Sequence, residues 1–333
     1  MSKYDQEMLA AMTQIVSIAG CYRKGELDFN FDTNHVARWI EQFDEAVRLE
    51  VLKELSFVLV ESYISKSKFI AYLTKVFNAL KYDSYPDRCV AWQNMNFLRI
   101  QERGNSQADM LSLFDQVFNE NCTGLTTLNC SSVSGSYIYL DDFVFTGFRL
   151  KRDLEKWIIE QAPNKTKLFV IVYGAYTGAW KNKEDIEKAI VQSGKNIILQ
   201  FVEGHSFENR RTYSSRSDVL WPSVIPDDIN VQKFLSGLGS QPVLRTVLGS
   251  IQKSNFSSPG GRELLEKEFL KAGANILERS GNFGPAHKPL GFMGFDSFGF
   301  GSVHVTYRNC PNNAPLALWA GDPWYPLFTR KIN

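Results

Sequence analysis

The stretch SYIYLDDFVFTGFRL, residues 136–150, decides the fold prediction. Tyr137–Leu140 is a run of apolar and aromatic residues with high β-propensity, which is typical of a buried strand. Two carboxylates follow, Asp141 and Asp142, and the Thr-Gly pair at 146–147 predicts a tight turn. Beyond the turn, apolar residues recur at helical spacing with charged residues between them. The pattern therefore predicts a strand, an acidic pair, a turn and a helix, in that order.

The junction between this strand and this helix suits an anionic ligand. A loop that opens a helix presents unpaired backbone N–H groups and the positive end of the helix dipole. Carboxylates at the carboxyl end of a strand lie where open α/β sheets bind their ligands. A purely structural interpretation also stands, in which Asp141 and Asp142 are a solvated strand end and a helix N-cap.

The order of strand, two acids, short loop and Thr-Gly resembles the PRPP-binding signature of the type I phosphoribosyltransferases. The resemblance implies that Asp141 and Asp142 form the catalytic pair and hydrogen-bond the ribose 2′- and 3′-hydroxyls. It also implies that the loop holds the 5′-phosphate through its backbone and through a threonine hydroxyl. In that family the residue before the Thr-Gly pair sometimes acts as a base. In this sequence position 145 is a phenylalanine, which cannot accept a proton. The phosphate-binding residues implied by the resemblance are Phe145, Thr146, Gly147, Phe148 and Arg149.

A second strand–turn–helix junction lies upstream of the motif. Phe97–Ile100 is predicted as a strand, and Gln107–Phe118 as a helix. The loop between them combines a cation, a flexible turn and side-chain donors. The same resemblance implies that this loop binds the pyrophosphate of PRPP. It also implies that Mg²⁺ binds together with that pyrophosphate, and we predict no metal-ligating residues in the protein itself. The residues concerned are Arg103, Gly104, Asn105 and Ser106.

Strands and helices continue to alternate after the motif. Leu168–Tyr173 and Asn196–Val202 are predicted as buried strands, and Lys183–Gln192 between them as a helix. This alternation predicts an α/β fold with a parallel sheet of the phosphoribosyltransferase type and helices on both faces.

The first part of the chain shows only helical patterns. It is predicted to form a bundle or a winged-helix-like module, and a polar segment at residues 81–88 separates it from the rest of the chain. We therefore predict an N-terminal helical domain over residues 1–85 and an α/β domain with a C-terminal extension over residues 90–333.

Charge, hydropathy and cysteine content narrow the function classes. The formal net charge of +1 gives no global field toward nucleic acid or acidic membranes. No apolar run is long enough to span a bilayer, and the N-terminus lacks the apolar core of a signal peptide. These features predict a cytoplasmic protein without membrane contact. The five cysteines are too few and too scattered for a disulfide framework.

Three segments are similar to a bacterial branch of phosphoribosyltransferase-like proteins found in conflict and phage-defence loci. They are the WIEQFD run within His35–Leu80, the central DDFVFTG motif, and the closing NCPNNAPLALWAG…WYPLF segment. In some loci such proteins accompany a retron reverse transcriptase as effectors. The resemblance implies a toxin-like effector whose N-terminal helical part meets a reverse transcriptase and its RNA or DNA product; a homo-oligomer is equally compatible.

Three functions are compatible with these observations. The first is a pentosyltransferase that binds PRPP or a nucleotide and transfers or cleaves a ribosyl-phosphate group. The second is a module that senses PRPP or a nucleotide without turnover and docks a reverse transcriptase–nucleic acid complex. The third is a structural partner in which the acidic pair is a cap. Ligand binding separates the third from the other two, and pyrophosphate release separates the first from the second.

Overall fold

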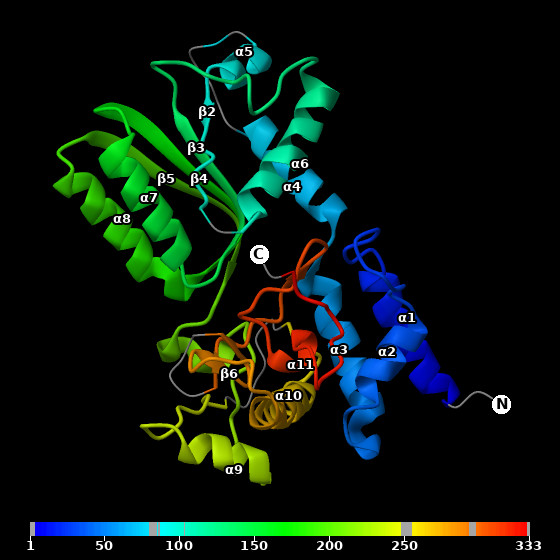
Figure 1. The fold of residues 1–333 in the computed structure, drawn as a ribbon. Coiled ribbons are helices and arrows are strands. Elements are labelled where there is room, and N and C mark those ends of the chain that lie inside the picture. The colour runs from blue at the N-terminus through cyan, green and yellow to red at the C-terminus, as the bar shows by residue number, and fades with distance from the viewer. Residues whose placement is uncertain are drawn as a thin grey trace. The chain divides into compact units, whose positions relative to one another are not determined.

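The computed structural model describes residues 4–79, 85, 87–102, 104–247, 255–292 and 298–331. The chain divides into two compact units (Figure 1). One unit, the sheet unit, is Ser67–Phe207. The other, the helical unit, joins Met1–Lys66 to Glu208–Ile332. This division differs from the predicted domains 1–85 and 90–333, because the N-terminal helices share one core with the C-terminal part of the chain.

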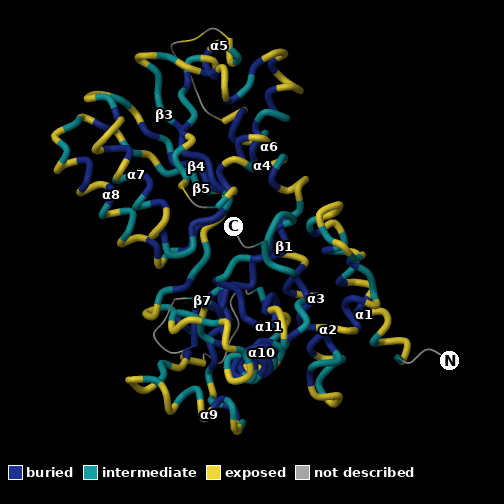
Figure 2. The backbone as a smooth tube through the Cα atoms, in the orientation of Figure 1, coloured by how far each residue is buried: buried dark blue, intermediate teal, exposed yellow. Residues whose placement is uncertain are grey.

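The sheet unit contains a four-stranded parallel sheet in the order β2-β3-β4-β5. This confirms the predicted parallel sheet. The two central strands are mostly buried, whereas β5 at the edge carries many exposed residues (Figure 2). The strands are β2 (Asn96–Phe97), β3 (Tyr137–Val144), β4 (Lys165–Tyr176) and β5 (Asn196–Phe207). The helices are α4 (Lys66–Ala79), α5 (Arg88–Gln93), α6 (Ser106–Asn121), α7 (Phe148–Glu160) and α8 (Trp180–Gln192).

Helices cover both faces of this sheet, as predicted, because side chains alternate along β3. Tyr137 and Tyr139 face α7: the ring of Tyr137 lies 5.1 Å from that of Trp157, and Tyr139 belongs to the core shared with α7 and α8. On the opposite face, Phe97 of β2 pairs with Ile138 and packs its ring 5.5 Å from that of Phe114 in α6. Figure 1 shows α7 and α8 on one side of the sheet and α4 and α6 on the other.

One disulfide, Cys89–Cys122, ties α5 to the end of α6. The sequence predicted no disulfide framework because the five cysteines are few and scattered. Their spacing in the sequence does not show which of them meet in space. Both cysteines flank an aromatic cluster in which Trp92 contacts Phe114 and Phe118. The bond therefore joins two elements that already share a core.

The helical unit is built around α10, which is covered by buried apolar side chains from both ends of the chain. Pairing of β1 with β8 also joins the first and last parts of the sequence. Its helices are α1 (Gln6–Ala19), α2 (Thr33–Ile40), η1 (Glu45–Val47), α3 (Arg48–Ser62), η3 (Arg211–Arg216), α9 (Ile229–Ser236), α10 (Pro259–Arg279) and α11 (Leu316–Trp319). Its strands are β1 (Tyr63–Ile64), β6 (His287–Lys288), β7 (Gly291–Phe292) and β8 (Val305–Thr306). Among the described residues, no helix combines the length and the apolarity needed to cross a bilayer.

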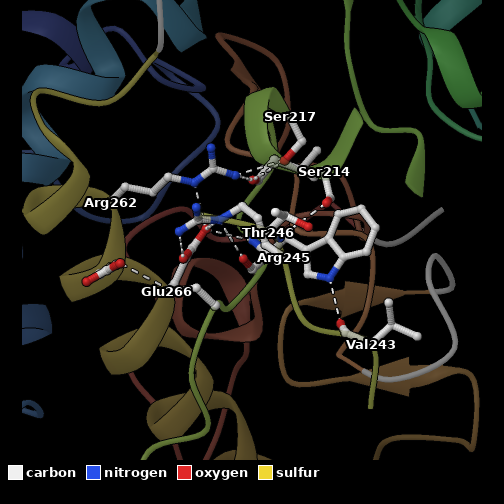
Figure 3. A network of polar contacts seen from close by, with 11 residues as sticks. Ser214, Ser217, Val243, Arg245, Thr246, Arg262 and Glu266 are labelled. Atoms are coloured by element: carbon white, nitrogen blue, oxygen red, sulfur yellow. Dashed lines mark hydrogen bonds and ion pairs between the residues drawn. The ribbon is translucent and has the colours of Figure 1, made fainter. Parts of the chain in front are cut away.

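A buried ionic network connects non-helical segments of the chain, around residues 217–219 and at Arg245, to α10 (Figure 3). Glu266 is 1% exposed and accepts from Arg245 at 2.8 Å and from Arg262 at 2.7 Å. Arg262 also donates to the Ser217 hydroxyl and to the Val219 carbonyl oxygen, both at 2.8 Å. Because both guanidinium groups are buried, the Glu266 carboxylate is needed to compensate their charge.

Glu266→Gln is expected to lower the free energy of unfolding of the helical unit by about 3–5 kcal/mol, because it leaves buried arginines without their counter-charge. Glu278→Gln is the matched control on the same helix. Its carboxylate pairs with Lys233 at 2.7 Å at the surface, with 46% of the side chain exposed, so its loss should cost about 1 kcal/mol or less. Urea unfolding of both variants measures the difference; equal midpoints would contradict a role for the buried pair.

Candidate functional site

The predicted site residues that the structure describes gather at the carboxyl edge of the sheet, beside β2 and β3. The chain leaves β2 toward α6 on one face and leaves β3 toward α7 on the other. Adjacent strands whose connections run to opposite faces leave a crevice outside their carboxyl ends, which is where open α/β sheets bind ligands. The Gly104–Ser106 loop and the turn 145–147 lie at this position, and we name the space outside the carboxyl ends of β2 and β3 the crevice.

The turn between β3 and α7 requires glycine at its last position. Gly147 has φ +78° and is the N-cap of α7, without a capping side-chain hydrogen bond from the described residues. A Cβ atom there would lie 3.2 Å from that of Asn182 and 3.3 Å from that of Ala179. The Asn182 side chain donates to the Thr146 carbonyl oxygen at 2.6 Å. The turn is thus held against the start of α8, with the Thr146 hydroxyl beside the first amides of α7.

The acidic pair lies inside β3, which extends to Val144, whereas the sequence predicted that the strand ends at Leu140. The chain between β3 and α7 is correspondingly confined to residues 145–147. Because side chains alternate along a strand, Asp141 and Asp142 point to opposite faces of the sheet. Asp142 is half-buried, and one of its oxygens accepts from the Phe143 amide at 2.7 Å.

Asp141 is turned inward and is only 7% exposed. Its Oδ1 accepts from the Asp142 amide at 2.8 Å, its Oδ2 accepts from the Tyr139 hydroxyl at 3.4 Å, and the Ser106 side chain also donates to it. Burial, followed by the neighbouring Asp142 charge, raises the pKa of Asp141 to about 7, although the hydrogen bonds and Arg149 oppose this shift.

Arg149 connects the two predicted loops. Its side chain is exposed, and its Nη1 would lie 3.0 Å from a Cβ atom placed on Gly104, which has φ +92°. The guanidinium group makes no hydrogen bond within the described residues, although its charge acts on Asp141, Asp153 and Tyr139. An exposed cation is therefore held over the loop that the sequence assigns to an anion.

The Gly104–Ser106 loop is shaped by two glutamines. The Gln107 Oε1 accepts from the amides of Ile100 and Gln101 at 2.8 and 3.2 Å. Gln101 in turn donates to the Ser106 hydroxyl at 2.9 Å. Asn105 is the N-cap of α6, again without a capping side-chain bond in the described chain. Arg103, also predicted for this loop, lies outside the described residues.

Phe145 lies in an aromatic stack, with ring centroids 5.6 Å from those of Phe143 and of Tyr176. Phe148, the first residue of α7, is 64% exposed. The ring at position 145 cannot act as a base, as its residue type already indicates, and the structure adds that this ring packs against its neighbours.

Sequence reasoning missed two groups that contact the site. Tyr139 lies two residues before Asp141, so the period of a strand alone places both on one face and could have revealed it. Asp153, four residues after Arg149 on α7, is 3% exposed, and its Oδ2 has no hydrogen-bond partner among the described residues. Burial raises the pKa of Asp153.

A separate cavity of about 450 Å³ lies in the helical unit, between α1 and α2. Its lining combines apolar side chains with one cation and one carboxylate, and it contains none of the predicted site residues. The lining residues are Tyr4, Leu9, Met12, Thr33, Asn34, Ala37, Arg38 and Glu41. The predicted site, at the two loops beside β2 and β3, is thus separate from this cavity.

A protein-family model described as PRTase-CE matches residues 36–330, which is most of the chain and includes both predicted loops. Comparison with curated proteins and with solved structures gives no significant match.

Gly147→Ala tests whether the turn depends on close approach as well as on backbone conformation. Gly194→Ala is the matched control, since Gly194 has φ +69° but no atom within 4 Å of the position that a Cβ atom would take. Both variants should lose about 1–2 kcal/mol of stability from the left-handed backbone. Gly147→Ala should lose more, because its methyl group meets Ala179 and Asn182. Chemical denaturation measures both; an equal loss would show that the contact with α8 does not constrain the turn.

Proposed function

The chain belongs to the PRTase-CE family, a phosphoribosyltransferase-like family, and on this premise we propose that it binds PRPP or a nucleotide in the crevice beside β2 and β3. The observation that carries the proposal is the position of Arg149, whose exposed guanidinium group lies over Gly104 and thereby joins the two loops. A ligand with phosphates at both ends of a ribose would fit such a pair of loops.

The 5′-phosphate is proposed to bind at the turn 145–147. Its oxygens would accept from the first amides of α7 and from the Thr146 hydroxyl, at the positive end of the helix dipole. The pyrophosphate is proposed to bind at the Gly104–Ser106 loop and at the start of α6, with Arg149 between the two anionic groups. Mg²⁺ enters the proposal only with the pyrophosphate of the ligand.

The ribose hydroxyls are assigned to the more exposed member of the acidic pair. Asp142, which is half-buried, is proposed as the carboxylate that accepts hydrogen bonds from the sugar. In a transferase reaction the bond between C1 of the ribose and the pyrophosphate oxygen breaks, and pyrophosphate leaves with the electron pair. An acceptor nucleophile then bonds to C1. Positioning of the sugar and stabilisation of charge would supply most of the rate acceleration.

A second candidate is a module that senses PRPP or a nucleotide without turnover. The observation that favours it is Phe145, which occupies the position of a possible base and is stacked on Phe143 and Tyr176. In this version the ligand would control the docking of a reverse transcriptase and its nucleic acid.

The proposal also includes a role as a retron-type effector in bacterial phage defence. It is supported by the sequence resemblance of the WIEQFD run, the central motif and the closing aromatic segment. A cytoplasmic location and a homo-oligomeric state belong to the same part of the proposal.

The proposal predicts that PRPP with Mg²⁺ binds the wild-type protein and that Asp142→Asn weakens binding and abolishes any turnover, because the sugar loses its charged acceptor. The matched control is Asp185→Asn, which removes a carboxylate of α8 that pairs with Lys151 of α7. This control should bind PRPP as the wild type does. Calorimetry measures binding, and a coupled assay measures pyrophosphate release.

Each outcome of this experiment selects one function. Binding with release supports a pentosyltransferase, and binding without release supports the sensor. Absence of binding by the wild type, or full activity of Asp142→Asn, would refute the assignment of the crevice.

A further inference from the structure

We infer that Asp141 is a positioning residue of this crevice, which holds the Gly104–Ser106 loop in place, and that its carboxyl group takes up a proton when an anionic ligand binds. The inference rests on the proposed function, because it concerns the same crevice. It assigns Asp141 a different task from Asp142, although the two are neighbours in the sequence.

The surroundings of Asp141 favour a role in holding the protein's own loop and not a direct hydrogen bond to the ribose. The carboxyl group is 7% exposed, and both of its oxygens have partners from the chain itself. Its neighbour Asp142, on the other face of the strand, is more exposed. A ribose hydroxyl would have to displace Tyr139 or Ser106 before it could reach Asp141.

Ser106 transmits the state of Asp141 to the loop. Its side chain donates to Asp141 and accepts from Gln101 at 2.9 Å. Gln101 also accepts from the amide of Gln107 at 3.2 Å, and Gln107 accepts from the amides of Ile100 and Gln101, which lie between β2 and the loop. A continuous set of hydrogen bonds therefore runs from the middle of β3 to the loop that is proposed to hold the pyrophosphate.

The charged groups around Asp141 come from three elements. Asp142 and the Tyr139 hydroxyl belong to its own strand, Ser106 begins α6, and Arg149 belongs to α7. Asp153 lies on α7 near the same arginine, and Glu102 acts on Asp153. Within this set, Arg149 is the cation that favours the ionised form of Asp141.

Ligand binding changes this balance in one direction. An anionic ligand brings negative charge close to Asp141 and engages Arg149, so both effects favour the neutral carboxyl group. Burial already raises the pKa of Asp141 to about 7 in the free protein, and binding should raise that pKa further. Between this pKa and the higher pKa of the complex, the free protein is mainly ionised at Asp141 and the complex is mainly protonated, so binding takes up a proton in that pH range.

The sign of the pH dependence follows from this uptake. Affinity should fall as pH rises above about 7, by up to tenfold per pH unit until the pKa of the complex is passed. Asp141→Asn replaces the carboxyl group with a neutral amide of the same shape, which cannot take up a proton. This variant should not take up the proton of Asp141 on binding. Its affinity should therefore not show the additional fall above pH 7 that this uptake causes.

The test is calorimetric titration of PRPP with Mg²⁺ between pH 7 and pH 9, in pairs of buffers with different ionisation enthalpies. The wild type should take up close to one proton at pH 8. Asp141→Asn should take up fewer and show a flatter pH profile. Asp153→Asn is the matched control: it removes the other buried carboxylate near Arg149 and should keep the wild-type profile. Ionisation of PRPP itself is common to all three proteins and cancels in the comparison.

The outcomes separate this inference from the proposed function. Equal pH profiles of the wild type and Asp141→Asn, or no proton uptake by the wild type at pH 8, overturn the inference while PRPP binding still stands. Loss of binding by Asp141→Asn at every pH, as expected for Asp142→Asn, would make Asp141 a direct ligand contact and also overturn it. Absence of PRPP binding by the wild type at every pH refutes the proposed function itself. Where Asp141→Asn does not fold, the uptake by the wild type is compared with that expected from the ionisation of PRPP and its Mg²⁺ complex at the same pH, and no excess over that value overturns the inference.

Discussion

Pairing of β3 between β2 and β4 is the constraint on which the proposed site depends. It fixes the strand as far as Val144, so that the chain can turn only at residues 145–147 before α7 begins. It also fixes which face each side chain takes, and therefore separates Asp141 from Asp142. Because α6 and α7 lie on opposite faces, the chain leaves the carboxyl ends of β2 and β3 in opposite directions, and this is the position where open α/β sheets bind ligands.

Polar groups are buried in both units, and Glu266 and Asp141 are two of them that neighbouring groups compensate. In the helical unit, Glu266 pairs with two buried arginines and connects non-helical segments of the chain to α10. In the sheet unit, Asp141 is hydrogen-bonded by its own strand and by the start of α6. The difference is that Asp141 lies beside an exposed cation at the edge of a sheet. A buried acid in that position can respond to a ligand, whereas the ionic network in the helical unit has a structural role.

Several elements were predictable because their signals are local. The strands around Leu168–Tyr173 and Asn196–Val202 and the helix at Gln107–Phe118 were found from apolar periodicity, although their ends were placed too early or too late. The end of β3 was misplaced because two carboxylates interrupt its apolar run. Each of these carboxylates accepts from the amide of the next residue, which allows them to lie inside the strand.

The sequence alone determined the strand–acid–turn–helix order, the parallel sheet and the residue types at the site, because these depend on propensity, periodicity and the conformational freedom of glycine. The tertiary structure decided which segments meet. It joined α3 to α10 in one core, paired Cys89 with Cys122, brought Arg149 over Gly104, and turned Asp141 inward. These arrangements depend on contacts between residues far apart in the chain, and local patterns carry no information about their partners.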